Sequence, residues 1–399
     1  MNLDKVILQL AESYLHDIIG IRNHFHRFPE LSFEEFSTSA YIQEQLKILE
    51  IPFKAGFVKT GIIGKIEGRN PAKRIVALRA DMDALPIFEK NSVPYRSENR
   101  GKMHACGHDL HMAALLGSAR ILQTMKDDFE GTVLLVFQPA EEKLPGGASL
   151  MLSEGAFKDA LPDLIIGQHV LPGLETGKVG YRSGVYMASS DEIQITVNGT
   201  GGHAAVPHQL VDPVLIAAHI IVALQQVISR NANVAIPSVL SFGKVEAAGA
   251  VNVIPSEVKI EGTFRTMNES WRKEAHQRIT KMARSIAEGM GGSIEISILD
   301  GYPVLENHAV YTAKAADFSR QLLGKDKVVD LDLRMTSEDF AYYSLHFPVV
   351  FYRFGTTDPE GRYTSPVHSP TYMADENALL TAMSNLAWLA LSFLNSNSL

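Results

Sequence analysis

The sequence predicts an α/β protein in which a largely parallel sheet is covered by helices and a smaller ferredoxin-like α+β domain is inserted. Two observations predict this fold. Near both ends of the chain, short apolar runs alternate with helical patterns, which is typical of crossover units and of a parallel sheet buried on both faces. Between them, the expected elements follow the order β-α-β-β-α-β of a split βαβ arrangement. The expected boundaries are 1–186 and 301–399 for the two parts of the main domain and 187–300 for the insert.

The main domain is expected to begin with two helices and then to alternate strands with helices. Apolar residues at helical spacing predict helices at 3–27, 34–50, 111–125, 146–155, 308–323, 337–345 and 375–395. Continuous apolar runs predict buried strands at 74–80, 132–138, 163–169 and 348–354. Pro29 is expected to stop the first helix, because proline cannot continue it.

The insert is patterned differently. Its first strand, DEIQITVNG (191–199), alternates apolar and polar residues as a half-exposed strand does. Its other elements are expected as a helix at 213–229, strands at 238–246 and 257–266, a helix at 269–289 and a strand at 293–299.

The composition excludes several classes of protein. The chain has 399 residues, 46% apolar and 21% charged, which is ordinary for a soluble protein of two or three domains. A formal charge of −8 argues against nucleic acid or an anionic membrane as the main partner. The single cysteine cannot form a disulfide within the chain, which suits a reducing compartment. Asp4, Lys5 and Glu12 interrupt a signal-peptide pattern, and no run approaches the roughly 18 apolar residues of a membrane span. We therefore expect a cytoplasmic protein.

Ionisable side chains follow the predicted strands, at the edge where open α/β sheets bind ligands. These residues are Asp81, Asp83, Glu141, Glu142, His169 and His368. The segment HACGHDLH (104–111), just before a helix, adds a thiol and three imidazoles within eight residues. Taken singly, each has an ordinary structural explanation, such as a helix cap, a surface charge or a small buried residue.

Their coincidence at one sheet edge favours a metal site. Zinc and related first-row metals take Cys, His and carboxylate ligands together in catalytic sites. One ion needs about three protein ligands, and at least five candidates are present, enough for two ions that share a ligand. Of the adjacent Glu141 and Glu142, one can bind metal while the other accepts a proton from activated water.

Seven motifs carry a resemblance to a known family. They occur in the order HACGHDLH, QPAEE, GGHAAVPH, NVIP, GTFRT, TSEDFA and VHSP. This order resembles the aminoacylase and carboxypeptidase G superfamily of co-catalytic metallohydrolases. The CGHD-x-H form is similar to its amidohydrolase branch, which includes hippurate hydrolases and N-acyl-L-amino acid amidohydrolases. The resemblance extends from about residue 20 to residue 390.

The resemblance implies a role for each motif residue. It implies two divalent metal ions (Zn, Mn, Co or Ni) held by Cys106, His108, Glu142, His169 and His368, with Cys106 as the bridging ligand. Glu141 matches the general base, and Asp83 matches the acid that orients a metal ligand. Where most of the superfamily carries a histidine two residues before that acid, this chain has Asp81, which we do not count as a ligand.

The resemblance also implies that the insert is a lid through which the chain forms a homodimer, with a tetramer as the alternative. His203, Asn252 and Arg265 match residues of that lid that contact substrate. The expected activity is metal-dependent hydrolysis of the amide bond of N-acyl amino acids, with an acetyl, benzoyl or similar acyl group.

Three alternatives remain open from the sequence. They are a metallo-dipeptidase or carboxypeptidase, a cysteine amidase with Cys106 as nucleophile, and a non-catalytic protein with a structural metal site. Structural sites prefer closed sets of Cys and His ligands, and the additional glutamate fits that class poorly.

Overall fold

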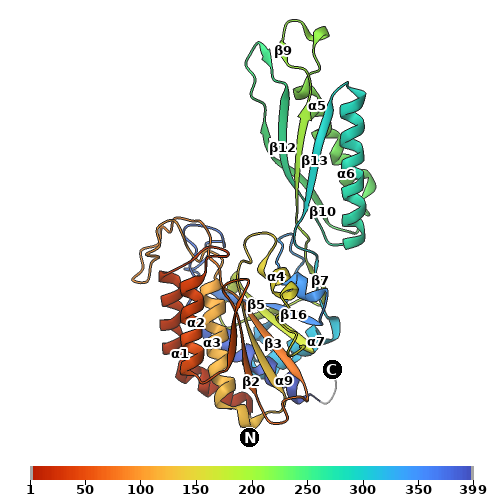
Figure 1. The fold of residues 1–399 in the computed structure, drawn as a ribbon. Helices are drawn as coiled ribbons and strands as arrows, with labels where there is room; N and C mark the ends of the chain where they lie inside the picture. The colour runs from red at the N-terminus through yellow and green to blue at the C-terminus, as the bar shows by residue number, and fades with distance from the viewer. Residues whose placement is uncertain (1–2, 397–399) are drawn as a thin grey trace. The chain divides into compact units, whose positions relative to one another are not determined.

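The fold was analysed in a computed structural model that describes residues 3–396 (Figure 1). The chain divides into two compact units. The first contains the chain up to Gly184, Glu306–Asp332 and the chain from Asp339 onward, and the second contains Val185–Leu305 and Leu333–Glu338. Short strands β7 (Gly184–Met187) and β14 (Leu305–Asn307) lie where the chain passes from one unit to the other. Each unit is described by itself below.

The first unit is built on one large sheet with the strand order β1-β2-β4-β3-β5-β16-β6-β15. Its strands are β1 (Phe53–Phe57), β2 (Gly61–Glu67), β3 (Ile75–Asp81), β4 (Thr132–Gln138), β5 (Leu164–Glu175), β6 (Val179–Tyr181), β15 (Val328–Asp330) and β16 (Val349–Thr357). Its helices are α1 (Leu3–Arg27), α2 (Phe36–Ile48), α3 (His108–Thr124), α4 (Gly147–Ser153), α7 (Ala309–Leu323), α8 (Ala341–Ser344) and α9 (Ala378–Asn395).

The α/β class is confirmed, and the expectation of a largely parallel sheet holds only in part because the sheet is mixed. The neighbours β4, β3, β5 and β16 are parallel, as crossover connections require. In contrast, β1 and β2 form an antiparallel hairpin, β2 pairs antiparallel with β4, and β6 pairs antiparallel with β16. The hairpin turn uses Val58 (φ 47°) and Lys59 (φ 73°), which lack the Asn-Gly signal that marks such turns in a sequence.

Helices α1, α3 and α9 pack together over the first unit's sheet (Figure 1). In the part of the chain that the structure describes, two helical segments are long and apolar enough to span a membrane, Pro213–Asn231 and Ala378–Asn395. The apolar window of the second is 78% buried inside the protein, so core packing accounts for its composition. The first is only 33% buried.

The predicted site residues lie at or near the carboxyl ends of the parallel strands. β3 ends at Asp81, which pairs with Gln138 at the end of β4. β5 passes through His169, and α3 begins at His108. Adjacent parallel strands place their carboxyl ends at one edge, so these side chains converge there.

The second unit has a sheet in the order β10-β12-β8-β13, with every neighbouring pair antiparallel. In chain order its elements are β8 (Asp191–Asn198), α5 (Pro213–Gln226), β10 (Ser238–Glu246), β12 (Glu257–Thr266), α6 (Glu269–Gly289) and β13 (Ser293–Asp300). This is the β-α-β-β-α-β order expected from the sequence. A small pair, β9 (Gly202–His203) with β11 (Val253–Ile254), lies beyond the end of this sheet (Figure 1).

Local sequence explains the second unit's helices. Asp212 caps α5 by accepting two backbone N–H groups, and Asn268 caps α6. Both helices bury one apolar side against the sheet, where they meet alternate residues of β8, Ile193, Ile195 and Val197. The unit therefore has a hydrophobic core of its own.

Candidate metal centre

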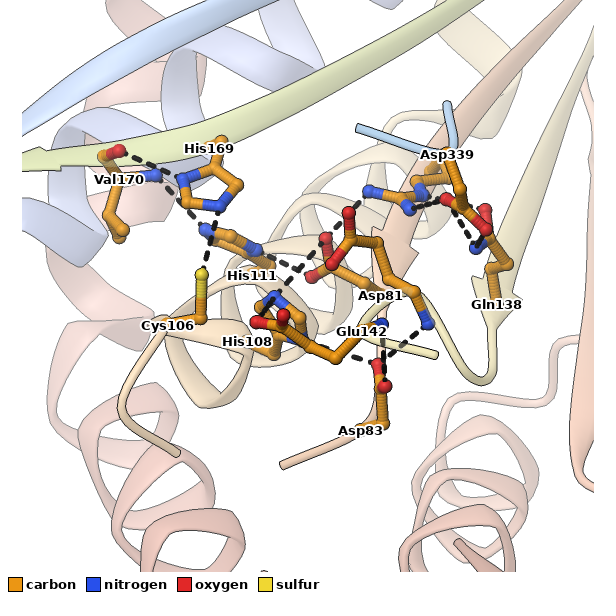
Figure 2. Close-up of polar contacts among 12 residues, drawn as sticks. Asp81, Asp83, Cys106, His108, His111, Gln138, Glu142, His169, Val170 and Asp339 are labelled. Carbon is orange, nitrogen blue, oxygen red and sulfur yellow. Dashed lines mark hydrogen bonds and ion pairs between the residues drawn. The ribbon is translucent and has the colours of Figure 1, made fainter. Parts of the chain in front are cut away.

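Five predicted ligands converge in the first unit as two overlapping sets. Figure 2 shows Cys106, His108, Glu142 and His169 of these sets. The Cys106 Sγ lies 3.4 Å from His169 Nε2 and 3.3 Å from His368 Nε2. His368 Nε2 is also 3.1 Å from Glu142 Oε1. The donor atoms of Cys106, His108 and His169 lie within 4.8 Å of one another, and so do those of Cys106, Glu142 and His368. Cys106 belongs to both sets, as a bridging ligand would.

A glycine allows the thiol and the first imidazole to stand two residues apart. Gly107 has φ +84°, in the left-handed region that glycine tolerates best. A Cβ there would lie 2.8 Å from a Val170 methyl group and 2.9 Å from the Tyr372 hydroxyl. Any side chain would therefore disturb both the backbone and the packing between Cys106 and His108.

The other two histidines are held through the backbone. His368 adopts φ +62°, which is uncommon for a residue with a side chain, and its N–H donates to the carbonyl of Ala105 at 2.8 Å. His169 Nδ1 donates to the carbonyl of Val170 at 2.9 Å, which leaves Nε2 directed at the thiol of Cys106.

Asp83 fixes the turn that carries the two glutamates. Its carboxylate accepts the N–H of Glu141 at 3.0 Å and of Glu142 at 2.9 Å, and the hydroxyl of Ser32 at 2.6 Å. Its Oδ1 also lies 3.4 Å from His108 Nδ1. A single buried carboxylate therefore orients both a histidine and the turn, which suits the orienting role that the resemblance implies.

A second buried carboxylate, Glu35, was not predicted from the sequence. It accepts the N–H of Ala140 at 2.9 Å, where Ala140 has φ +53°, and the N–H of Phe33 at 3.0 Å. Burial and the charge of Asp83 raise the pKa of Glu35 to about 7. Glu35 and Asp83 together hold three successive N–H groups of the turn. No sequence motif marks this function, because Glu35 acts on the backbone.

Asp81 already has partners for both of its oxygens (Figure 2). Oδ2 accepts from Arg79 at 2.6 Å, and Oδ1 lies 2.6 Å from His111 Nδ1. Arg79 also donates to Asp339 at 2.8 Å and to Gln138 at 2.9 Å. This buried network accounts for Asp81 without a metal contact.

The cluster has buried polar atoms without hydrogen bonds and several negative charges, and both features suit the binding of cations. Both nitrogens of His108 and Oε1 of Glu142 are buried without a hydrogen bond, an arrangement that is costly unless another group binds them. Burial alone would lower the pKa of His108, but the charges of Asp81 and Asp83 outweigh it and raise that pKa to about 10. The donor set of thiol, imidazole and carboxylate is the set that divalent first-row metals accept.

Two further pKa shifts bear on the chemistry. Burial, followed by the charges of Glu142 and Glu141, raises the pKa of the Cys106 thiol well above its ordinary value. Burial and the charge of Arg353 lower the pKa of His169, which keeps that imidazole neutral as a metal ligand must be.

The three predicted substrate-binding residues lie in the second unit. His203 is exposed on β9 and pairs with Val253, and the carbonyl of Asn252 accepts the N–H of Ala204 at 3.0 Å. Arg265 lies on β12, half-buried, and its guanidinium lies 3.3 Å from the carbonyl of Met335. His203 and Asn252 are therefore neighbours.

Arg265 stands near the opposite end of that sheet. β12 begins at Glu257, which pairs with Asn198 close to the β9 loop, and Arg265 follows eight positions later. A strand rises about 3.3 Å per residue, so roughly 26 Å separates Glu257 from Arg265. The structure does not bring Arg265 and His203 of one chain together around one small molecule.

The chain is similar to several known proteins. The model of peptidase family M20/M25/M40 matches residues 77–391. The chain is 40% identical over 380 residues to an N-acetyl-L-cysteine deacetylase of Bacillus subtilis, covering 95% of this chain and 89% of that protein. It is also 40% identical over 302 residues to an N-acyl-L-amino acid amidohydrolase of Geobacillus stearothermophilus, covering 76% and 81%. Among solved structures, a Bacillus subtilis dinuclear metal binding peptidase of the M20 family superposes with TM-score 0.83 at 33% identity, covering 96% of this chain and 99% of that one.

Proposed function

This chain belongs to the peptidase family M20/M25/M40, and on that premise we propose that it is a metal-dependent amidohydrolase of N-acyl amino acids. The reaction releases a carboxylic acid and an amino acid. The observation that carries the proposal is the pair of donor sets that share Cys106, next to a turn that presents Glu141. The deacetylase and amidohydrolase relatives support the same substrate class.

The proposed cofactors are two divalent ions chosen from Zn, Mn, Co and Ni. One would be held by Cys106, His108 and His169, and the other by Cys106, Glu142 and His368. Ions bound there supply Lewis acidity, which polarises the amide carbonyl and acidifies water.

The chain's own residues then move the proton. Glu141 lies in the turn fixed by Asp83, next to Glu142. We assign Glu141 as the group that accepts a proton from the attacking water and returns it to the leaving nitrogen. Asp83 contacts both the turn and His108, and so fixes their positions relative to each other.

The cysteine amidase alternative is disfavoured by the surroundings of Cys106. A nucleophilic cysteine needs a lowered pKa so that the thiolate is present. Here burial and neighbouring carboxylates raise the pKa of the thiol, and His169 and His368 both approach the same sulfur. Such an environment favours a thiolate only when cations balance the carboxylates.

A substrate screen tests the proposed activity. We expect N-acetyl and N-benzoyl amino acids to be hydrolysed with kcat/KM well above that for dipeptides or for substrates of carboxypeptidases. The screen would be repeated with each of the four metals. Preferential cleavage of dipeptides would instead assign the chain to the peptidase members of the family.

We also propose a cytoplasmic homodimer formed through the second unit. Apolar side chains are exposed on α5 and on the edge strand β10, with Val222 73%, Leu215 51% and Val245 51% exposed. Edge strands and apolar patches of this kind commonly pair with another chain. A single cysteine that serves as a metal ligand suits a reducing compartment.

We expect Arg265 to bind the α-carboxylate of the substrate. A guanidinium grips a carboxylate through two parallel hydrogen bonds, which lysine cannot copy. Arg265→Lys is therefore expected to raise KM for N-acyl amino acids about tenfold or more and to change KM for their amides little, as measured by steady-state kinetics. Equal losses for the acids and the amides would refute the contact.

The separation of Arg265 from His203 supports a site completed across the dimer. We propose that His203 reaches the active site of the partner subunit, with Asn252 beside it. In a two-fold dimer each subunit would then supply one part of each site.

Mixed dimers test this arrangement. Homodimers of Glu141→Gln and of His203→Ala should each be nearly inactive. When the two variants exchange subunits, about half of the dimers are mixed and each has one intact site, so activity should return to about a quarter of wild type. Confirmed exchange without recovery would show that His203 does not act across the dimer.

A further inference from the structure

His111 is a histidine of the metal cluster whose two nitrogens are both engaged by protein groups (Figure 2). Its Nε2 accepts the backbone N–H of Val170 at 3.0 Å, so the ring proton is on Nδ1. Nδ1 donates that proton to Oδ1 of Asp81 at 2.6 Å. Although Asp81, His108 and His111 lie close enough to hold an ion, His111 has no lone pair left to offer one.

His111 fills a gap between two strands. β3 and β5 pair from Val76 and Leu164 as far as Arg79 and Gly167. Beyond that point β5 continues to Glu175, paired on its other side with β16. The strands part at the site, and a buried N–H group on the open side of β5 needs a partner that β3 no longer supplies.

The imidazole supplies that partner and joins the two strands. It connects Asp81, at the end of β3, to Val170 of β5. Asp81 is itself anchored by Arg79, which is tied to Asp339. His111 is 1% exposed, so the link is shielded from water.

The residue that His111 holds, Val170, also orients a metal ligand. His169 precedes Val170 directly, and its Nδ1 donates to the Val170 carbonyl at 2.9 Å. The position of Val170 therefore sets the direction of His169 Nε2, which lies 3.4 Å from the Cys106 sulfur. A shift of β5 at Val170 would move His169 away from Cys106 and His108.

We propose that His111 is a positioning residue: by holding Val170 it sets the affinity of the Cys106, His108 and His169 set for its ion, without binding that ion. The inference rests on the proposed metal-dependent function. It also gives a function to His111 of the motif HACGHDLH, which neither donor set uses.

Three substitutions at one position separate the two hydrogen bonds. In His111→Gln the amide reaches the place of Nε2 and can still accept from Val170. In His111→Asn it reaches only the place of Nδ1 and can still donate to Asp81. His111→Leu removes both bonds. Leu115→Ala, a fully buried change on the same helix, is the control for lost stability alone.

Metal binding is the readout. Protein freed of metal is titrated with Zn²⁺ and Co²⁺, the number of ions per chain and both dissociation constants are measured, and the Co²⁺ absorption bands are recorded. Wild type should bind two ions. His111→Leu and His111→Asn should weaken one ion about 10–100-fold, as loss of a ligand's supporting partner typically does, and leave the other unchanged. His111→Gln should retain most of the affinity.

A double substitution identifies which ion is affected. His169→Ala should weaken the same ion, and adding His111→Leu to it should cause little further loss, because both act on one ligand. Four results would overturn the positioning role. Leu115→Ala could weaken metal binding as much as His111→Leu does, or His111→Leu could lose both ions. The losses of affinity in the double variant could be additive, or His111→Asn could retain more affinity than His111→Gln. A wild type that binds no ions would overturn the proposed function as well, whereas two ions bound equally tightly by every His111 variant would overturn the positioning role alone.

Discussion

Glu141→Gln is expected to lower kcat by about 10²–10⁴-fold while the protein still binds two metal ions per chain. Glutamine has the size of glutamate but cannot accept a proton from water. Asp83 holds the turn through backbone N–H groups, which the substitution does not touch, so the position of Glu142 is retained. Steady-state kinetics and metal analysis of the same preparation measure both quantities.

Glu142→Gln is the matched control, because it changes the adjacent residue in the same way. Its Oε1 lies 3.1 Å from His368 Nε2 within the second donor set, so its substitution should lower metal occupancy. If Glu141→Gln lost metal and Glu142→Gln kept it while losing turnover, the assignments of base and ligand would be exchanged.

Cys106→Ala is expected to weaken both ions and to abolish activity, which is the largest effect on metal binding in the chain. Cys106 is the member common to the two donor sets, and its sulfur lies between His169 and His368. Metal titration should show both dissociation constants rising by tenfold or more, whereas His368→Ala should raise only one. Two tightly bound ions in Cys106→Ala would exclude a bridging role for the sulfur.

The convergence of the candidate residues could be predicted from the sequence because they lie where parallel strands end. Asp81, His169 and the glutamate pair each follow an apolar run, and sheet geometry gathers such positions at one edge. The structure does gather Cys106 and its predicted companions there, while their roles stay predictions. The family resemblance and the α/β class are confirmed.

The features that could not be predicted from the sequence are contacts with backbone groups and an unusual turn. Glu35 acts on the N–H of Ala140, and His111 acts on the N–H of Val170. Almost every residue has a backbone N–H group, so the residue type at the donor position does not indicate either contact. The hairpin of β1 and β2 was missed for a related reason, since Val58 and Lys59 adopt positive φ without the residues that usually announce such a turn.

The distance between Arg265 and His203 within one chain could be seen only in the structure. Both match substrate contacts of the family, but the order of the motifs does not give the distance between them. Strand register shows instead that they lie near opposite ends of the second unit's sheet. Strand pairing is needed to see that these two residues of one chain lie too far apart to contact one small molecule.

Reconstitution of metal-free protein tests the central claim most directly. After chelation and verified removal of metal, a divalent first-row ion is added back stepwise while hydrolysis of an N-acyl amino acid is followed. The account predicts that metal-free protein has no measurable activity and that activity is fully restored at two ions per chain. Full activity in protein verified to be free of metal would contradict it.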